Sequence, residues 1–166
     1  MEEKKTRQPV AAYAVAVALV VALDQALKAW VRANIPLYPA VSEQVPLIPG
    51  LIHLSHIHNT GVAFGMLQGG RWAFLVLLAV FCALVVWAVK TKWLATPLER
   101  WLAVLAMGGA LGNGIDRALY GYVVDMLEVE FMSFPVFNLA DCVINVSAVL
   151  FILVMLLPRK DREANK

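Results

Sequence analysis

The sequence predicts an all-α polytopic membrane protein of four transmembrane helices, with a small β-platform on its outer side. The chain of 166 residues is 61% hydrophobic and only 16% charged, whereas soluble domains carry about 25% charged residues. Four apolar stretches reach the length that a helix needs to cross a bilayer. A segment rich in proline and glycine separates the first stretch from the second.

The predicted spans are residues 10–31, 72–89, 98–115 and 139–157, within a single membrane-embedded domain of residues 1–166. Basic residues precede the first span, so it could imitate a cleavable secretory signal. Its apolar run resumes after Asp24 as far as Val31, however, and about 22 residues make about 33 Å of helix, enough to span a bilayer. We therefore expect a retained first helix.

The segment of residues 34–70 cannot form one long helix, because prolines and glycines recur through it. Within it, residues 51–58 include an alternation of apolar and polar side chains, which is typical of a strand at a surface. We expect an outer sheet platform here.

Basic residues gather in alternate loops. They precede the first span, separate the second from the third, and follow the fourth: Lys4, Lys5, Arg7, Lys90, Lys92, Arg100, Arg159, Lys160, Arg162 and Lys166. The opposite loops are poorer in basic residues: the first offers only Arg32 and Arg71, and residues 118–137 contain no lysine or arginine. By the positive-inside rule, both termini are cytoplasmic, and the platform and the loop of residues 121–137 face outward. A net charge of +2 distributed in this way gives no support for nucleic-acid binding.

Several charged and amide side chains fall within the spans, where a central charge costs at least about 2.5 kcal/mol. Asp24 and Lys28 are four residues apart on one helix face, and we expect a structural ion pair. Asn113, Asp116 and Arg117 share one face of the third span. A pairing of Arg117 with Asp116 would leave little unpaired charge there.

Asp125 and Asp141 have no obvious cationic partner in their own segments. Asn138, Asp141 and Asn145 form a polar stripe along the fourth span, and Asn138 is placed to cap that helix. A hairpin between the last two spans can bring Asp125 to the depth of Asp141. Two close carboxylates cannot both ionise cheaply, so one keeps a proton while the other stays anionic. Such a pair can activate water and protonate a leaving amine, as an aspartic peptidase does, without a metal.

A metal site or a reactive thiol has weaker support in the sequence than the pair of carboxylates. His53, His56 and His58 lack a helical His-Glu-x-x-His pattern and a nearby acid, so we expect solvated strand residues and no metal site. Cys82 and Cys142 lie in apolar runs, which favours small buried residues over a disulfide. We expect no cofactor.

Two functions outside catalysis remain open. Intramembrane acids can mark the ion pathway of a transporter, but such a pathway should place acids through the full bilayer depth, whereas Asp116, Asp125 and Asp141 cluster toward the outer end. A structural scaffold would use the charges only for helix association. It would tolerate Asp125→Asn without loss of any activity.

Five sequence blocks occur in order along the chain. They are Asp24-Gln25-x-x-Lys28, Asn59-Thr60-Gly61-Val62-Ala63-Phe64, Gly108-Gly109-Ala110-Leu111-Gly112-Asn113 with Asp116-Arg117, Gly121-Tyr122-Val123-Val124-Asp125, and Phe137-Asn138-Leu139-Ala140-Asp141. With these blocks the chain resembles the lipoprotein signal peptidases, or signal peptidase II, which are aspartic peptidases of the bacterial inner membrane. The resemblance covers nearly the whole chain. It departs from the family pattern at Gly114, Met126 and Cys142, none of which replaces a carboxylate.

The resemblance implies a catalytic dyad of Asp125 and Asp141. It implies substrate-holding or dyad-supporting roles for Asn59, Asn113, Arg117 and Asn138, whereas Asp24, Lys28 and Asp116 are expected to be structural. The implied fold is four helices with an outer β-cradle and a mobile outer loop. The implied substrates are prolipoproteins, cleaved just before a cysteine that carries diacylglycerol. We expect a monomer that works among membrane lipids of the bacterial inner membrane, with its active site at the outer face.

Overall fold

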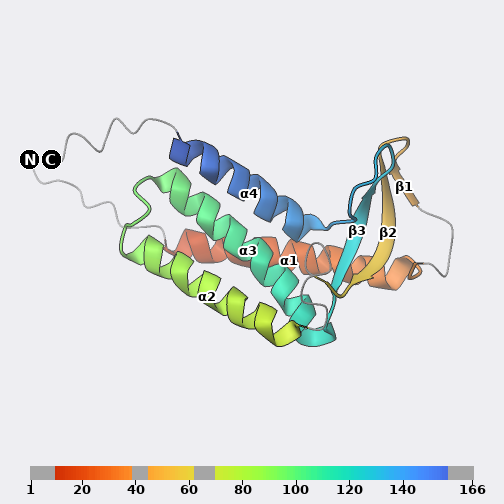
Figure 1. The fold of residues 1–166 in the computed structure, drawn as a ribbon, viewed down its shortest axis with the longest axis horizontal. Coiled ribbons are helices and arrows are strands. Elements are labelled where there is room, and N and C mark those ends of the chain that lie inside the picture. Colours follow the sequence, from red (N-terminus) through yellow and green to blue (C-terminus); the bar gives the residue numbers. More distant parts are fainter. Residues whose placement is uncertain (1–9, 39–44, 62–69, 157–166) are drawn as a thin grey trace, which may run out of the picture.

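The helices of the described residues lie side by side, and a small sheet stands across one end of the bundle (Figure 1). The computed structural model describes residues 10–38, 45–61 and 70–156. Its elements are α1 (Val10–Asn34), β1 (Val45–Ile48), β2 (Ile52–Asn59), α2 (Arg71–Lys90), α3 (Pro97–Tyr120), β3 (Val123–Val129) and α4 (Leu139–Leu156). The prediction of a mostly helical chain with a small sheet is confirmed.

Among the described residues, three helices are long and apolar enough to cross a membrane: α1, α2 and α4. Their exposed side chains are largely apolar, as contact with lipid requires, and include Leu19, Val76 and Val146. The third predicted span, α3, is not one of these three. A count of four spans therefore stays a prediction.

The central helix of the bundle is α3, which packs against α1, α2 and α4. Glycines allow this close approach. A Cβ at Gly109 would lie 2.7 Å from the Ala140 carbonyl oxygen, and one at Gly112 would lie 2.6 Å from Asp24 Oδ2. These contacts set the spacing between the helices that carry the polar residues.

The sheet is antiparallel, in the order β1-β2-β3. The β1–β2 hairpin forms part of the predicted platform, whose residues 39–44 and 62–69 lie outside the described ranges. Gly50, in the connecting turn, has φ of 75°, a left-handed conformation that favours glycine. Pro46 lies in β1, the edge strand, where its missing N–H is tolerated.

The third strand, β3, lies in residues 121–137, for which the sequence predicts only a loop. It follows at once on α3, which ends at Gly121 with φ of 80° and an N–H that donates to the Arg117 carbonyl. Val123 and Val124 are fully buried, and the strand's burial continues through Met126. This strand carries Asp125 to the end of the bundle.

Candidate active site

Asp125 and Asp141 line one pocket at the sheet end of the bundle. The pocket has a volume of about 950 Å³, and its walls come from β2, β3, the β3–α4 connection and the three helices α2, α3 and α4. Asn59, Asn113, Arg117 and Asn145 line it too. Six segments of the chain thus meet around two carboxylates.

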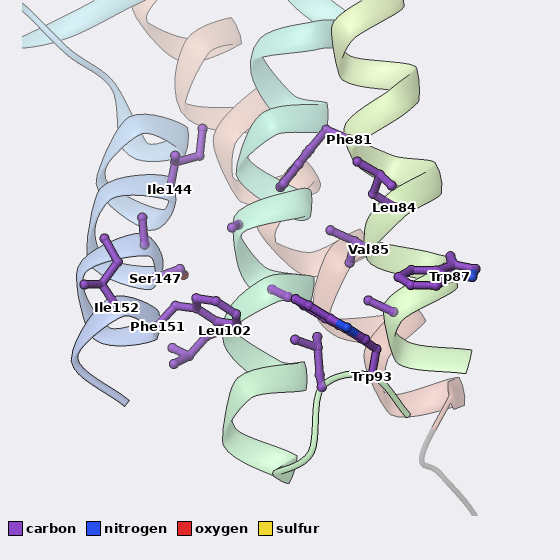
Figure 2. Close-up of a pocket in the computed structure, with 15 residues that line it drawn as sticks. Phe81, Leu84, Val85, Trp87, Trp93, Leu102, Ile144, Ser147, Phe151 and Ile152 are labelled. Carbon is purple, nitrogen blue, oxygen red and sulfur yellow. The ribbon is translucent and has the colours of Figure 1, made fainter. Parts of the chain in front are cut away.

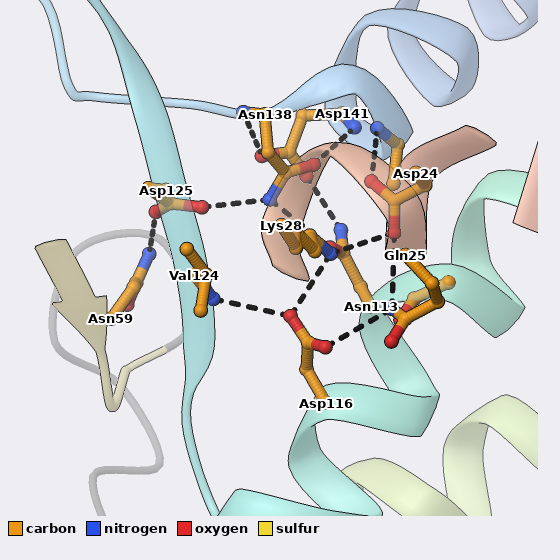
Figure 3. A network of polar contacts seen from close by, with 12 residues as sticks. Asp24, Gln25, Lys28, Asn59, Asn113, Asp116, Val124, Asp125, Asn138 and Asp141 are labelled. Carbon is orange, nitrogen blue, oxygen red and sulfur yellow. Dashed lines mark hydrogen bonds and ion pairs between the residues drawn. The ribbon is translucent and has the colours of Figure 1, made fainter. Parts of the chain in front are cut away.

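Asp125 is nearly buried, with 3% of its surface exposed, and both of its oxygens accept amide N–H groups (Figure 3). Asn138 Nδ2 donates to Oδ1 at 2.7 Å, and Asn59 Nδ2 donates to Oδ2 at 2.8 Å. The sheet register makes the second bond possible. Ile57 of β2 is paired with Asp125, so Asn59 is the diagonal neighbour on the same face.

Asp141 and Asn138 cap the first turn of α4 reciprocally. The backbone N–H of Asp141 donates to Asn138 Oδ1 at 3.0 Å, and the backbone N–H of Asn138 donates to Asp141 Oδ2 at 3.2 Å. This is a capping box built from an amide and an acid. Asn138 therefore contacts both candidate carboxylates, that of Asp125 through its side-chain amide and that of Asp141 through its backbone N–H, so one residue lies between them.

Asn113 connects the dyad to the helix core. Its Nδ2 donates to Asp141 Oδ1 at 2.7 Å. Its Oδ1 accepts from Asn138 Nδ2 at 3.1 Å and from Lys28 Nζ at 2.9 Å. Each carboxylate oxygen of Asp125 and Asp141 thus has a hydrogen-bond donor from an asparagine, either its amide or its backbone N–H.

Lys28 has no exposed side-chain surface and uses three acceptors. Besides Asn113, it contacts Asp24 at 2.8 Å and Asp116 at 3.1 Å. The predicted ion pair of Asp24 with Lys28 is confirmed. Asp24 also accepts the Ala140 backbone N–H at 3.1 Å, which ties α1 to the first turn of α4.

Asp116 holds β3 in place. Its Oδ2 accepts the Val124 backbone N–H at 3.1 Å, one residue before Asp125. The proposed pairing with Arg117 is wrong, because the cations around Asp116 are Lys28 and, at 3.9 Å, Arg32. Successive residues on a helix point about 100° apart, so neighbours do not face each other.

Arg117 points to the pocket instead. Its Nη2 donates to the Gly61 carbonyl at 3.1 Å, and its guanidinium lies 4.1 Å from the centre of the Phe74 ring. Gly61 in turn donates its N–H to Asn59 Oδ1 at 3.0 Å. Arg117 therefore braces the segment that presents Asn59 to Asp125.

Burial dominates the electrostatics of Asp125 and raises its pKa to about 6. The hydrogen bond from Asn59 opposes this rise, and the charge of Asp141 adds to it. Asp125 can therefore hold a proton at a pH where an ordinary aspartate is ionised. Burial also lowers the pKa of His58, whose ring stacks on Tyr122 at 3.7 Å between ring centres.

The three histidines have different surroundings and do not converge on one site. His56 is buried, contrary to the expectation of a solvated residue, and its Nδ1 lies 2.8 Å from the Ile35 carbonyl oxygen. Within the described ranges, no group of histidine, cysteine and acidic residues has the arrangement of a metal site. His53 does have a nearby acid, contrary to the expectation: its Nε2 lies 3.3 Å from Glu130 Oε2, just beyond the end of β3 and away from the pocket. The two residues are distant in sequence, so only the pairing of β2 with β3 brings them together.

Sequence reasoning assigned no role to two polar residues that the fold uses. Gln25 Nε2 donates to the Gly112 carbonyl at 3.1 Å and to Asp116 Oδ1 at 3.0 Å. Glu99 has no exposed surface and completes a capping box with Thr96 at the start of α3. The Thr96-Pro97-x-Glu99 pattern is a readable helix start, and Gln25 belongs to the block Asp24-Gln25-x-x-Lys28, which could have drawn attention to it.

Comparison with known proteins gives consistent matches. The profile of the signal peptidase II family, peptidase A8, matches residues 16–157. A lipoprotein signal peptidase of Syntrophomonas wolfei is 41% identical over 148 residues, which are 89% of this chain and 94% of that protein. One of Thermosynechococcus vestitus is 42% identical over 135 residues, covering 79% and 82%.

Solved structures agree with these matches. Two structures of bacterial membrane enzymes, obtained by the in meso method at 2.3 and 1.9 Å resolution, superpose with TM-scores of 0.82 at 25% identity. They cover 96% of this chain and 94% or 99% of theirs.

The apolar helices and the fold define a bacterial membrane protein with a polar pocket at one end of its bundle. The matched profile and the relatives go further, because they identify the family of the protein. The chain belongs to the signal peptidase II family of peptidases.

Proposed function

We propose that this protein is an aspartic endopeptidase that removes the signal peptide from diacylglyceryl-modified prolipoproteins, cleaving just before the lipidated cysteine. The observation that carries the proposal is the pair of carboxylates, Asp125 and Asp141, which line one pocket and both bond to Asn138. The names of the relatives supply the substrate class.

In the proposed reaction, one carboxylate of the dyad is anionic and the other is protonated. The anionic carboxylate accepts a proton from water as the water oxygen attacks the scissile carbonyl carbon. The protonated carboxyl donates a hydrogen bond to the carbonyl oxygen. When the C–N bond breaks, the dyad returns a proton to the leaving nitrogen, which becomes the amino group of the lipidated cysteine.

The buried supports have separate tasks in this reaction. The amides of Asn59, Asn113 and Asn138 hold the carboxylates in fixed positions, so little reorganisation is needed at the moment of attack. Lys28 compensates the charges of Asp24 and Asp116. These two acids are thereby kept out of the chemistry and serve the fold.

We further propose that α3 is the fourth span. It has 24 residues, about 36 Å of helix, and its fully buried carboxylates, Glu99 and Asp116, are shielded from lipid by the bundle. Both termini would then be cytoplasmic and the sheet end of the bundle would face outward. A lipidated substrate could keep its acyl chains in the bilayer while its peptide meets the dyad at the outer interface.

The decisive experiment is cleavage of a synthetic diacylglyceryl prolipoprotein in detergent or lipid by wild type, Asp125→Asn and Asp141→Asn. We expect wild type to cut before the lipidated cysteine. Each variant should lose at least about 10³-fold in rate, because neither amide can exchange the protons that the dyad moves.

The matched control is Glu130→Gln, the same carboxylate-to-amide change at an exposed residue outside the pocket. It should cleave as wild type does. Normal cleavage by both folded dyad variants would refute the dyad, and failure of folded wild type to cleave would refute the peptidase assignment.

A further inference from the structure

A second cavity lies between α2 and α4, with α3 as its floor, and the dyad network does not use it (Figure 2). Its volume is about 540 Å³. The lining side chains are apolar except for the mostly buried Ser147, and two indoles, Trp87 and Trp93, lie at the end distant from the dyad. We call this cavity the α2–α4 groove.

The groove continues the pocket of the dyad along all three helices. Ile144 of α4 lines both cavities. On α3, Ala110 lines the pocket and Ala106, one turn away, lines the groove. On α2, Phe74 lines the pocket and Phe81, two turns along the same face, lines the groove.

The dimensions of the groove suit a single hydrocarbon chain. The ten residues from Asp141 to Phe151 rise about 15 Å along α4, which is half of the ~30 Å hydrocarbon core and so the depth of one leaflet. The lining surface is apolar along this whole depth, so it offers contacts to a hydrocarbon chain and no partners for the backbone N–H and C=O groups of an extended peptide.

We propose that the α2–α4 groove holds one acyl chain of the lipid-modified substrate while the scissile bond lies at the dyad. This inference rests on the proposed function and adds a binding site to it. Lipid is as apolar as the groove, so the hydrophobic effect favours neither. The groove contributes packing and position: a chain held along α3 fixes how far the lipidated cysteine can stand from Asp125 and Asp141.

The test varies the length of the acyl chain and the depth of the groove together. Ala103 lies on the groove floor, ten residues or about 15 Å along α3 from Asn113. Ala103→Phe should block the deep end. The matched control is Ala83→Phe on α2, an exposed alanine that does not line the groove. Each variant is assayed with dipalmitoyl and dioctanoyl forms of one prolipoprotein peptide.

We expect Ala103→Phe to lower kcat/KM for the dipalmitoyl substrate by about tenfold or more, since displacing a reacting group by about 1 Å can cost on the order of 10²-fold. Cleavage of the dioctanoyl substrate should stay near the wild-type rate, because its chain ends before the block. That normal rate also shows that the variant is folded. Ala83→Phe should leave both rates unchanged.

If Ala103→Phe loses both activities, Ile152→Trp decides the question, because Ile152 lines the groove wall and its exposed side chain tolerates enlargement. Equal effects on both substrates in Ile152→Trp, or no effect in either variant, would overturn the proposal. Equal losses would point to the signal-peptide segment as the part that approaches the groove. A wild-type protein that cleaves neither substrate would instead refute the proposed function.

Discussion

Lys28 sets the direction of hydrogen bonding through the candidate site. An ammonium group can only donate, so Asn113 must turn its oxygen toward Lys28 and its Nδ2 toward Asp141. Asn138 is oriented in the same way, because its oxygen accepts the Asp141 backbone N–H and its Nδ2 is left to donate to Asp125. Both carboxylates therefore receive donors that a flipped amide could not provide.

The proton on Asp125 should make stability depend on pH. The pKa of Asp125 is about 6 in the folded protein, against 3.8 for an aspartate in an unfolded chain. The folded state binds this proton more tightly than the unfolded state does. The resulting stabilisation is therefore complete below about pH 3.8 and is lost as the pH rises through about 6. The shift corresponds to about 3 kcal/mol.

The measurement is thermal unfolding of wild type and Asp125→Asn from about pH 4 to about pH 7, the window of this shift. The asparagine cannot titrate, so the unfolding temperature of the variant minus that of wild type should increase as pH rises. The result is the slope of this temperature difference against pH, because a constant cost of fitting an amide at this position does not change the slope. A difference that stays constant with pH would mean that another group holds the proton.

At the scale of elements, α3 positions the dyad through its glycines. Gly109 lies against the Ala140 backbone, one residue before Asp141. Gly109→Ala must move α3 away from the first turn of α4, because a backbone carbonyl cannot swing aside. The bonds from Asn113 to Asp141 and to Asn138 would lengthen. We expect the cleavage rate to fall about 10²-fold and the unfolding temperature to decrease.

Gly114→Ala is the matched control on the same helix. The atom that its Cβ would meet is a terminal methyl of Leu78, which can rotate away. The gain in helix propensity of about 1 kcal/mol offsets part of the cost, so this variant should keep most of its activity. Equal losses in the two variants would show that α3 tolerates no added volume anywhere, and that its spacing to α4 has no special role.

The helices were largely predictable and the sheet was only partly so. Long apolar runs identify α1, α2 and α4 directly, with boundaries within three residues of those observed at each end. The apolar run predicts that α3 starts one residue later than observed, and that it ends five residues before Tyr120 because charged residues interrupt the run. β3 was missed because its partner β2 is distant in sequence, so no local pattern announces the pairing.

The grouping of the site residues followed from sequence blocks, whereas their contacts required the fold. The bond from Asn59 to Asp125 depends on the register of β2 with β3. The bond from Asp116 to Val124 depends on the sharp turn at Gly121. Neither strand register nor turn geometry is visible in a single sequence. The predicted pairing of Arg117 with Asp116 is wrong for another reason, because adjacent residues on a helix do not face each other.

At the scale of the whole molecule, the candidate site and the α2–α3 loop lie at opposite ends of the bundle (Figure 1). Lys90 and Lys92 lie in or next to that loop, whereas the β3–α4 connection contains Ser133 and no lysine or arginine. Lysine and arginine are retained on the cytoplasmic side during insertion. The two ends should therefore face different compartments, with the dyad outside.

Single cysteines test this topology in a protein whose own thiols, Cys82 and Cys142, are replaced by alanine. Lys90→Cys and Ser133→Cys are both at exposed positions, one at each end. A membrane-impermeant maleimide applied to intact spheroplasts should label the Ser133→Cys protein and reach the Lys90→Cys protein only after permeabilisation. The two variants control each other for reactivity, because both label once the membrane is opened. The opposite pattern would put the dyad in the cytoplasm, where a signal peptide that has crossed the membrane could not reach it.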